Sequence, residues 1–212
     1  MDSQNLPAVL HEVRERMARA ATAAGRSAQS VTLLAVGKAQ PAELLAAAAD
    51  CGVTDFGESY LQEALAKIAA LRSRALTWHF IGRIQANKTR PIAESFSWVH
   101  ALDRVKVAER LAAQRPLEAP PLNVCLEVNI AGVARLPRLA LRGLMCIPPD
   151  EAEPARQRAW FARLRGLRDD LNATGYSLDT LSMGMSADFE AAIQEGATIV
   201  RLGTVLFGAR PR

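Results

Sequence analysis

Short apolar segments alternate with amphipathic segments along almost the whole chain. The apolar segments are rich in Val, Ile and Leu, which is typical of strands that are buried on both faces. Eight of them are expected as strands: Val31–Val36, Val53–Gly57, Thr77–Gly82, Ser97–Leu102, Leu122–Ile130, Leu139–Ile147, Leu178–Gly184 and Thr198–Gly203.

The segments between these strands have helical periodicity. Pro41 suits the first turn of a helix, Gly25 and Gly196 suit helix ends, and Asp103 is expected to cap a helix N-terminus. The expected helices are Asn5–Ala24, Pro41–Asp50, Tyr60–Leu71, Asn87–Ser95, Arg104–Gln114, Pro154–Asn172 and Asp188–Glu195, with a short one after Thr204.

Alternation of strands and helices predicts an α/β protein with parallel strands and outer helices. Eight units favour a single (β/α)8 TIM barrel over residues 1–212, with an extra N-terminal helix. An open doubly wound sheet is the alternative, but no glycine-rich dinucleotide motif follows the first strand.

One interval does not fit this rhythm. Between Ile130 and Leu139 the sequence has only "AGVARLPR", whereas a crossover between parallel strands needs about a dozen residues or more. "VARLPR" has the character of the end of a helix. We therefore expect either a local defect in the barrel or residues missing between Gly132 and Val133.

Composition and charge narrow the class of protein. Half of the 212 residues are hydrophobic, and no apolar stretch reaches the roughly 18 residues of a membrane span. The N-terminus is charged and amphipathic, so we expect a cytoplasmic protein. The net charge is +4, but the arginines are scattered and crowd only on one expected helix, which disfavours nucleic acid. Three isolated cysteines and three histidines predict no metal site.

Lys38 is the first candidate for chemistry. The chain has four lysines against 22 arginines, and this one follows the first expected strand. In a TIM barrel the C-terminal strand ends form the catalytic face. Partial desolvation there lowers the pKa of a lysine, and a neutral amine can form a Schiff base with a carbonyl. The alternative is a lysine that extends from a strand end into solvent.

The last two expected strands end in residues suited to a phosphate. "SMGMS" contains Ser182, Met183 and Ser186 before a helix that Ser186 is expected to cap, and "RLGT" contains Gly203 and Thr204. Loops after the seventh and eighth strands of such barrels often bind phosphate. Each motif alone suits an ordinary turn or cap, but the two together favour a phosphate site.

Arg201 lies inside the last apolar strand, where a charged side chain is costly unless it is paired. A cofactor with a lysine Schiff base, a phosphate and a ring nitrogen needs a partner at that nitrogen. Arginine keeps its proton and so leaves a pyridine nitrogen unprotonated. The alternative is a structural arginine paired with a carboxylate such as Glu127.

These residues resemble a known family. The motifs "LLAVGK", "DFGESYLQE", "WHFIGRIQANK", "LRGLMCIP" and "SMGMSADFEAAIQEGATIVRLGTVLFG" are similar to those of the pyridoxal 5′-phosphate homeostasis proteins, which are related to the N-terminal barrel of alanine racemase. The resemblance covers the chain from Val31 nearly to its end.

The resemblance implies roles for particular residues. It implies that Lys38 carries pyridoxal 5′-phosphate as a Schiff base and that Arg201 faces the pyridine nitrogen. It implies phosphate contacts from Ser186, Gly203 and Thr204. The same analogy places His79, Asn87 and the segment 57–59 near the cofactor, although His79 also suits a buried structural histidine.

Three departures from the family pattern stand out. Ser59 occupies a position where the family usually has asparagine, which puts one side-chain contact in doubt. Gly37 replaces a serine or threonine, with little expected effect. The family's Lys-Ser-Gly loop falls in the interval that is too short here, so no second cofactor-binding lysine is assigned.

The resemblance favours a carrier that binds pyridoxal 5′-phosphate reversibly, as a monomer, and hands it to apo-enzymes. Racemisation needs acid–base groups on both faces of the substrate carbanion. In alanine racemase a tyrosine from a second domain supplies one of them, and we expect no counterpart of that domain here. The sequence places neither Tyr60 nor Tyr176 at the catalytic end of a strand. A racemase or lyase, and a cofactor-free Schiff-base aldolase, are the alternatives.

Overall fold

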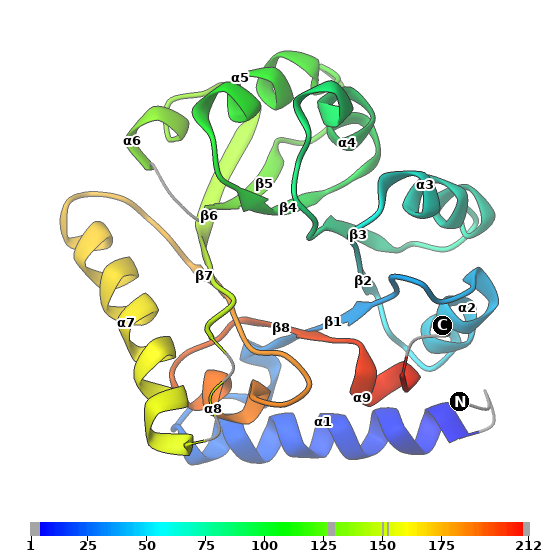
Figure 1. The fold of residues 1–212 in the computed structure, drawn as a ribbon, viewed down its shortest axis with the longest axis vertical. Coiled ribbons are helices and arrows are strands. Elements are labelled where there is room, and N and C mark those ends of the chain that lie inside the picture. The colour runs from blue at the N-terminus through cyan, green and yellow to red at the C-terminus, as the bar shows by residue number, and fades with distance from the viewer. Residues whose placement is uncertain (1–4, 127–129, 150, 152, 210–212) are drawn as a thin grey trace.

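Parallel strands close into a barrel at the centre of the molecule. The computed structural model describes residues 5–126, 130–149, 151 and 153–209. Within them, eight strands pair in chain order and β8 pairs with β1, so the sheet has no free edge (Figure 1). The strands are β1 (Thr32–Val36), β2 (Asp55–Glu58), β3 (Thr77–Phe80), β4 (Trp98–Leu102), β5 (Leu122–Leu126), β6 (Leu139–Met145), β7 (Thr180–Ser182) and β8 (Ile199–Leu202).

Helices surround this barrel, so the fold is the expected (β/α)8 TIM barrel (Figure 1). The α-helices are α1 (Leu6–Ala23), α2 (Ala42–Asp50), α3 (Leu61–Ala70), α4 (Thr89–Ser95), α5 (Val105–Gln114), α6 (Ile130–Val133), α7 (Pro154–Ala173), α8 (Phe189–Gln194) and α9 (Thr204–Phe207). Two 3-10 turns, Ala28–Ser30 and Ala86–Lys88, precede β1 and α4. No helix in the described ranges is both long enough and apolar enough to cross a bilayer.

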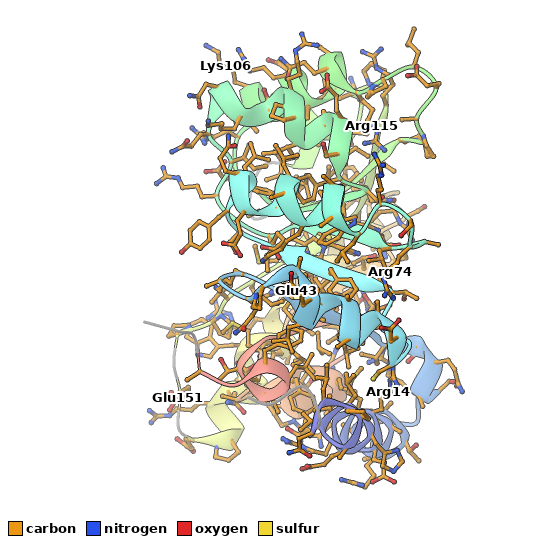
Figure 2. The ribbon with its side chains drawn as sticks, turned by 90° about the vertical axis from the view of Figure 1, so that its right-hand side faces the viewer. Arg14, Glu43, Arg74, Lys106, Arg115 and Glu151 are labelled. Carbon is orange, nitrogen blue, oxygen red and sulfur yellow. The ribbon has the colours of Figure 1, made fainter. Side chains whose placement is uncertain are left out.

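The extra N-terminal helix α1 is part of the core. It packs against α8 and α9, next to the junction between β1 and β8 (Figure 1). Its buried residues Leu6, Leu10, Val13 and Met17 recur every three or four positions, which places them on one face. Figure 2 shows α1 nearly end-on beside α2, where Arg14 donates hydrogen bonds to the carbonyls of Cys51 and Gly52.

A buried arginine also connects two of the outer helices. Arg115, labelled in Figure 2, is 6% exposed and donates from Nη1 to the carbonyl oxygens of Ala93 and Phe96, at 2.6 and 2.8 Å. These carbonyls lie at the C-terminal end of α4, where the last helical C=O groups have no partner inside the helix. Arg115 therefore joins the end of α5 to the end of α4.

The structure corrects two details of the sequence prediction. Asp103 does not cap α5, because the N-cap position is Arg104 and no side chain caps this helix. Ile130, expected at the end of the fifth strand, begins the single turn of α6 instead. β5 and β6 still pair as parallel neighbours, so the barrel is closed at the interval that the sequence marked as defective.

The inside of the barrel contains polar side chains. His79, His100, Ser182 and Arg201 are each at most 6% exposed and come from four different strands. The main apolar core lies instead between the sheet and the helices, where the large side chains of Phe56, Phe161 and Phe189 are completely buried. The apolar layer joins the helices to the sheet, and the polar side chains inside the barrel extend toward one of its ends.

Candidate functional site

A cavity of about 310 Å³ lies at the C-terminal ends of the strands. Its walls come from the ends of β1 and β8 and from the segments after β1, β2, β3, β6, β7 and β8. This is the end of a (β/α)8 barrel at which ligands bind. Five of the residues that line it were expected from the sequence to bind a cofactor, namely Lys38, Ser186, Arg201, Gly203 and Thr204, and Ser59 lines it as well.

Lys38 extends from a tight turn after β1. Gly37 donates its N–H to the carbonyl of Gly57 on β2, and Gln40 closes the turn by donating to the carbonyl of Gly37. Between them Ala39 has φ of 60°, a left-handed conformation that costs a residue with a Cβ about 1–2 kcal/mol. The Lys38 side chain is half-buried at the cavity wall.

A buried ion cluster holds this turn in place. Lys67 on α3 donates from Nζ to the carbonyl of Gly37 at 2.6 Å and to Glu58 Oε1 at 2.8 Å, and it also contacts Glu63. Glu63 Oε1 accepts the N–H of Ala39 at 2.7 Å. The residues on both sides of Lys38 are therefore fixed by one lysine and two carboxyl groups.

Sequence reasoning did not single out this cluster. Lys67 is one of four lysines, and Glu58 and Glu63 both lie in the quoted motif "DFGESYLQE". A buried lysine four residues after a glutamate on one helix indicates an ion pair. The spacing alone did not show that the pair reaches back to the backbone of β1.

Glu58 is completely buried, and its Oε2 has no hydrogen-bond partner among the described residues. Burial raises the pKa of this carboxyl to about 7, although Lys67 favours the charged form. A Cβ on Gly37 would lie 2.6 Å from Glu58 Oε1 and 2.8 Å from Leu45 Cδ2. The glycine at position 37 is therefore coupled to Glu58, because a side chain there requires Glu58 and Leu45 to move.

Arg201 approaches the cavity from inside the barrel. Its Nη1 donates to the carbonyl and the hydroxyl of Ser182 at 2.6 and 2.9 Å, and its Nη2 donates to the carbonyl of Cys146 at 2.9 Å. The three acceptors of these hydrogen bonds are neutral. An arginine side chain stays protonated in proteins, so Arg201 brings a positive charge to the cavity wall. Glu127, the alternative carboxylate partner, lies outside the described residues.

The segments after β7 and β8 meet at another part of the cavity wall, next to the end of β1. Ser186 Oγ accepts the N–H of Val205 at 3.2 Å, which ties the loop after β7 to the start of α9. Ser186 does not cap α8 as expected, since the N-cap residue of that helix is Asp188. Thr204 and Gly203 complete this wall, where Gly203 brings its backbone close to Val36 without a side chain.

The remaining expected residues do not line this cavity. Ser182 and Met183 are completely buried beneath it, with Ser182 bonded to Arg201. His79 is 1% exposed and hydrogen-bonded to His100 and Asp55 inside the barrel. Asn87 is exposed on the 3-10 turn before α4. The structure brings six of the expected residues to one cavity, and the other four do not line it.

Comparisons with known proteins assign the family. The sequence pattern of the family described as alanine racemase, N-terminal domain, matches residues 9–136 and 130–211. The pyridoxal phosphate homeostasis protein of Pseudomonas aeruginosa is 55% identical over 226 residues, which cover 98% of this chain and 95% of that protein. The chain belongs to the pyridoxal phosphate homeostasis protein family.

Two further relatives agree with this assignment. The pyridoxal phosphate homeostasis protein of Escherichia coli is 46% identical over 222 residues, which cover 95% of each chain. The structure of PipY from Synechococcus elongatus, with PLP bound, is 36% identical with a TM-score of 0.81. It covers 92% of this chain and 100% of that one.

The short interval after β5 also stands out in these comparisons. The two matches to the family pattern overlap at residues 130–136, the segment that contains α6. The alignment with the P. aeruginosa protein runs over 226 residues, more than the 212 of this chain, so it contains positions that this chain lacks. Where those residues fall along the chain stays a prediction from the sequence.

Replacement of Glu58 by glutamine should change how stability depends on pH. A folded-state pKa of about 7 lies above the ordinary value of 4.5, so the folded protein binds more protons than the unfolded chain between these values. The charge of Glu58 therefore costs stability as pH rises through this window. Relative to Glu58→Gln, the wild-type free energy of unfolding should fall by ~2 kcal/mol between about pH 5 and pH 8.

Urea unfolding followed by tryptophan fluorescence at several pH values measures this difference. Contributions from the buried histidines are present in both proteins and cancel. Glu43→Gln, at an exposed carboxyl on α2 outside this cluster, is the control and should keep the wild-type slope. Parallel pH profiles for wild type and Glu58→Gln would contradict the prediction.

Replacement of Ala39 by glycine should stabilise the protein. Glycine adopts a φ of 60° without the steric cost of a Cβ, which outweighs the greater freedom of the unfolded chain. We expect the free energy of unfolding to rise by about 0.5–1 kcal/mol. Ala47→Gly in the middle of α2 is the control and should lower it by about 1 kcal/mol. A loss of stability in Ala39→Gly would show that this turn is not strained.

Proposed function

We propose that this protein binds pyridoxal 5′-phosphate reversibly through a Schiff base on Lys38 and acts as a carrier of the cofactor. One observation carries the proposal: an amine, a guanidinium and two hydroxyl groups, from Lys38, Arg201, Ser186 and Thr204, line the same cavity. The names of its relatives and the PLP-bound PipY structure support the choice of cofactor.

The residues present fit the chemical groups of this cofactor. The cavity volume of about 310 Å³ lies at the lower end of the range for small-molecule sites. The amine of Lys38 condenses with the aldehyde and releases water. The hydroxyl groups of Ser186 and Thr204 donate to phosphate oxygens, and Arg201 donates to the ring nitrogen, which then stays unprotonated.

The composition of the cavity favours a carrier over an enzyme. Within the described residues, its lining includes no histidine, tyrosine or carboxylic acid. Racemisation and elimination need such groups to move protons at the substrate carbon. Exposed apolar residues, Ile147 and Met185, form part of its rim and leave the site open to solvent. In this proposal the protein acts as a cytoplasmic monomer that passes the cofactor to apo-enzymes.

Reduction with borohydride tests the Schiff base. Protein incubated with pyridoxal 5′-phosphate should turn yellow, and reduction should fix one cofactor on Lys38, as mass spectrometry of the peptides reports. Lys38→Ala should stay colourless and unmodified. Lys106→Ala, at an exposed lysine on α5, is the control and should behave as wild type.

Other outcomes separate the alternative functions. A wild-type protein that stays colourless with the cofactor, yet is trapped on Lys38 by borohydride with a sugar phosphate, would favour the aldolase. Exchange of the α-proton of L-alanine by the holoprotein, well above that of free cofactor and lost in Lys38→Ala, would favour a racemase or lyase. The carrier proposal expects neither result.

Substitution at Thr204 tests the phosphate wall. Thr204→Val keeps the shape of the side chain and removes its hydroxyl, so the dissociation constant for pyridoxal 5′-phosphate should rise about tenfold. The affinity for pyridoxal, which has no phosphate, should not change. Thr204→Ser restores the hydroxyl and should restore affinity. Equal losses for both compounds, measured by absorbance titration, would show that Thr204 does not contact the phosphate.

A further inference from the structure

A continuous line of hydrogen bonds crosses the inside of the barrel. Asp55 Oδ1 lies 3.0 Å from His79 Nε2, and His79 Nδ1 lies 2.9 Å from His100 Nε2. His100 Nδ1 lies 2.7 Å from Ser182 Oγ, which is 2.9 Å from Arg201 Nη1. This line joins the first residue of β2, at the N-terminal end of the barrel, to the cavity at the other end.

The charge of Asp55 fixes the direction of every bond in the line. Although burial raises it, hydrogen bonds from His79 and Thr54 bring the pKa of Asp55 below its ordinary value, so the carboxylate is ionised. An ionised carboxylate only accepts hydrogen bonds. His79 Nε2 must therefore carry a proton and donate it toward Asp55.

The positions of the protons on both imidazoles follow from the proton on His79 Nε2. Burial lowers the pKa of His79 and lowers that of His100 well below its usual value, so both rings are neutral and each carries one N–H. With its proton on Nε2, His79 accepts at Nδ1, so His100 donates from Nε2. His100 then accepts at Nδ1, and the donor there is the hydroxyl of Ser182.

The last bond reaches Arg201. Because its hydroxyl proton is directed to His100, Ser182 Oγ presents a lone pair to the guanidinium, and Arg201 Nη1 donates to it. The reverse direction would place a nitrogen lone pair of His79 against the Asp55 carboxylate at 3.0 Å. Two acceptors at that distance repel each other, so only one direction is compatible with an ionised Asp55.

We propose that Asp55, acting through His79, His100 and Ser182, is a positioning residue that fixes the Arg201 guanidinium in the cavity from the opposite end of the barrel. Its effect on the cofactor rests on the proposed function, whereas the direction of the hydrogen bonds does not. Neutral imidazoles add no second positive charge beside Arg201.

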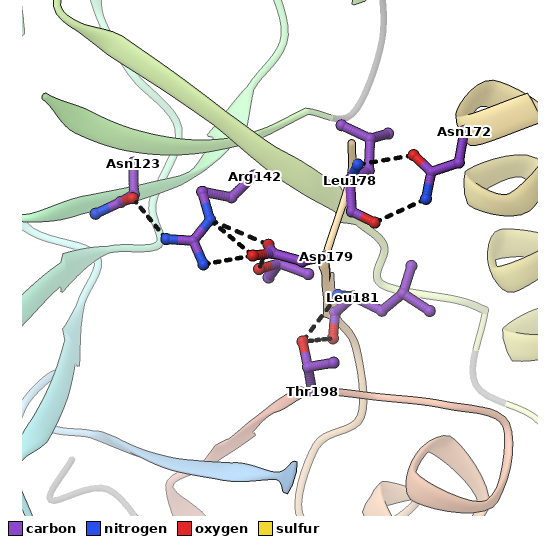
Figure 3. A network of polar contacts seen from close by, with 8 residues as sticks. Asn123, Arg142, Asn172, Leu178, Asp179, Leu181 and Thr198 are labelled. Atoms are coloured by element: carbon purple, nitrogen blue, oxygen red, sulfur yellow. Dashed lines mark hydrogen bonds and ion pairs between the residues drawn. The ribbon is translucent and has the colours of Figure 1, made fainter. Parts of the chain in front are cut away.

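A second arginine, Arg142, is kept apart from this line by the ring of Trp98. Arg142 is the extra residue at a bulge of β6, and Figure 3 shows its guanidinium bonded to Asp179 and to Asn123. It lies over the ring of Trp98, which in turn stacks on His79 with 5.5 Å between ring centroids. Trp98 therefore separates the charge of Arg142 from the histidines.

Nuclear magnetic resonance of ligand-free protein labelled with ¹⁵N-histidine and ¹⁵N-arginine tests the direction. Long-range proton–nitrogen correlation distinguishes the two neutral tautomers and the charged ring. Wild type near pH 7 should show both His79 and His100 as the neutral form with its proton on Nε2. An Nδ1–H tautomer or an imidazolium at either position would overturn the proposal.

Asp55→Asn tests whether Asp55 sets the direction. An asparagine can donate as well as accept, so both directions become allowed and both histidines should show mixed tautomers. The signals of the Arg201 guanidinium should broaden as its rotation becomes faster. His100 is separated from position 55 by two hydrogen bonds, so local repacking around the substitution is not expected to change the tautomer of His100.

Asp179→Asn is the matched control, because it makes the same substitution beside β7 at a carboxylate that is bonded to Arg142 and not to the histidines (Figure 3). It should leave both tautomers and the Arg201 signals unchanged. The dissociation constant for pyridoxal 5′-phosphate should rise roughly three- to tenfold in Asp55→Asn and stay within twofold of wild type in the control.

The outcomes separate this inference from the proposed function. If wild type fails to bind pyridoxal 5′-phosphate, the proposed function is wrong, and the tautomers and Arg201 signals still decide whether Asp55 fixes the guanidinium. Pure Nε2–H tautomers in Asp55→Asn, or an unchanged Arg201 signal, would overturn the inference. Mixed tautomers with unchanged cofactor affinity would overturn its link to the cavity.

Discussion

Burial of the Arg201 guanidinium inside the barrel is the constraint on which the other polar features depend. A charged group in this position requires acceptors on several strands, and the structure supplies them from Ser182 on β7 and Cys146 after β6. Ser182 in turn needs His100, which needs His79 and Asp55. One buried cation thus explains why this barrel has a polar interior where apolar layers are usual.

The turn that carries Lys38 meets a related constraint on the outer side of the sheet. Ala39 occupies a costly backbone conformation, and Lys67 and Glu63 hold the peptide groups on either side of Lys38. Strained conformations persist where surrounding contacts determine them, and they often lie at functional sites. Here that contact set includes a carboxyl group, Glu58, which titrates near neutral pH. The two buried charge clusters approach the cavity from different sides.

The sequence predicted the architecture well because the signals for it are local. Each strand is a short apolar run bounded by helical sequence, and the expected residues at the ends of β1, β7 and β8 line one cavity. The sequence could not show that Ser186 bonds Val205 on α9, or that Lys67 reaches the carbonyl of Gly37. Both contacts join elements that only the closed barrel brings together. The same holds for His79, which the family resemblance placed near the cofactor and the structure places, with His100, in a line of hydrogen bonds that leads to Arg201.

In the proposed function, solvent access to the cavity favours holding the cofactor over using it in a reaction. An enzyme gains from excluding water, since a dry site strengthens electrostatic interactions and prevents side reactions. A carrier gains from admitting water, because hydrolysis of a Schiff base is the step that releases its cargo. Thr204 and Met185 at the rim are exposed and Lys38 is only half-buried, so the cavity wall that contains Lys38 is accessible to solvent. Buried hydrogen bonds hold Arg201 and the turn that carries Lys38, whereas the residues at the rim of the cavity are exposed. That division suits the proposed role of a carrier, whose task ends with release.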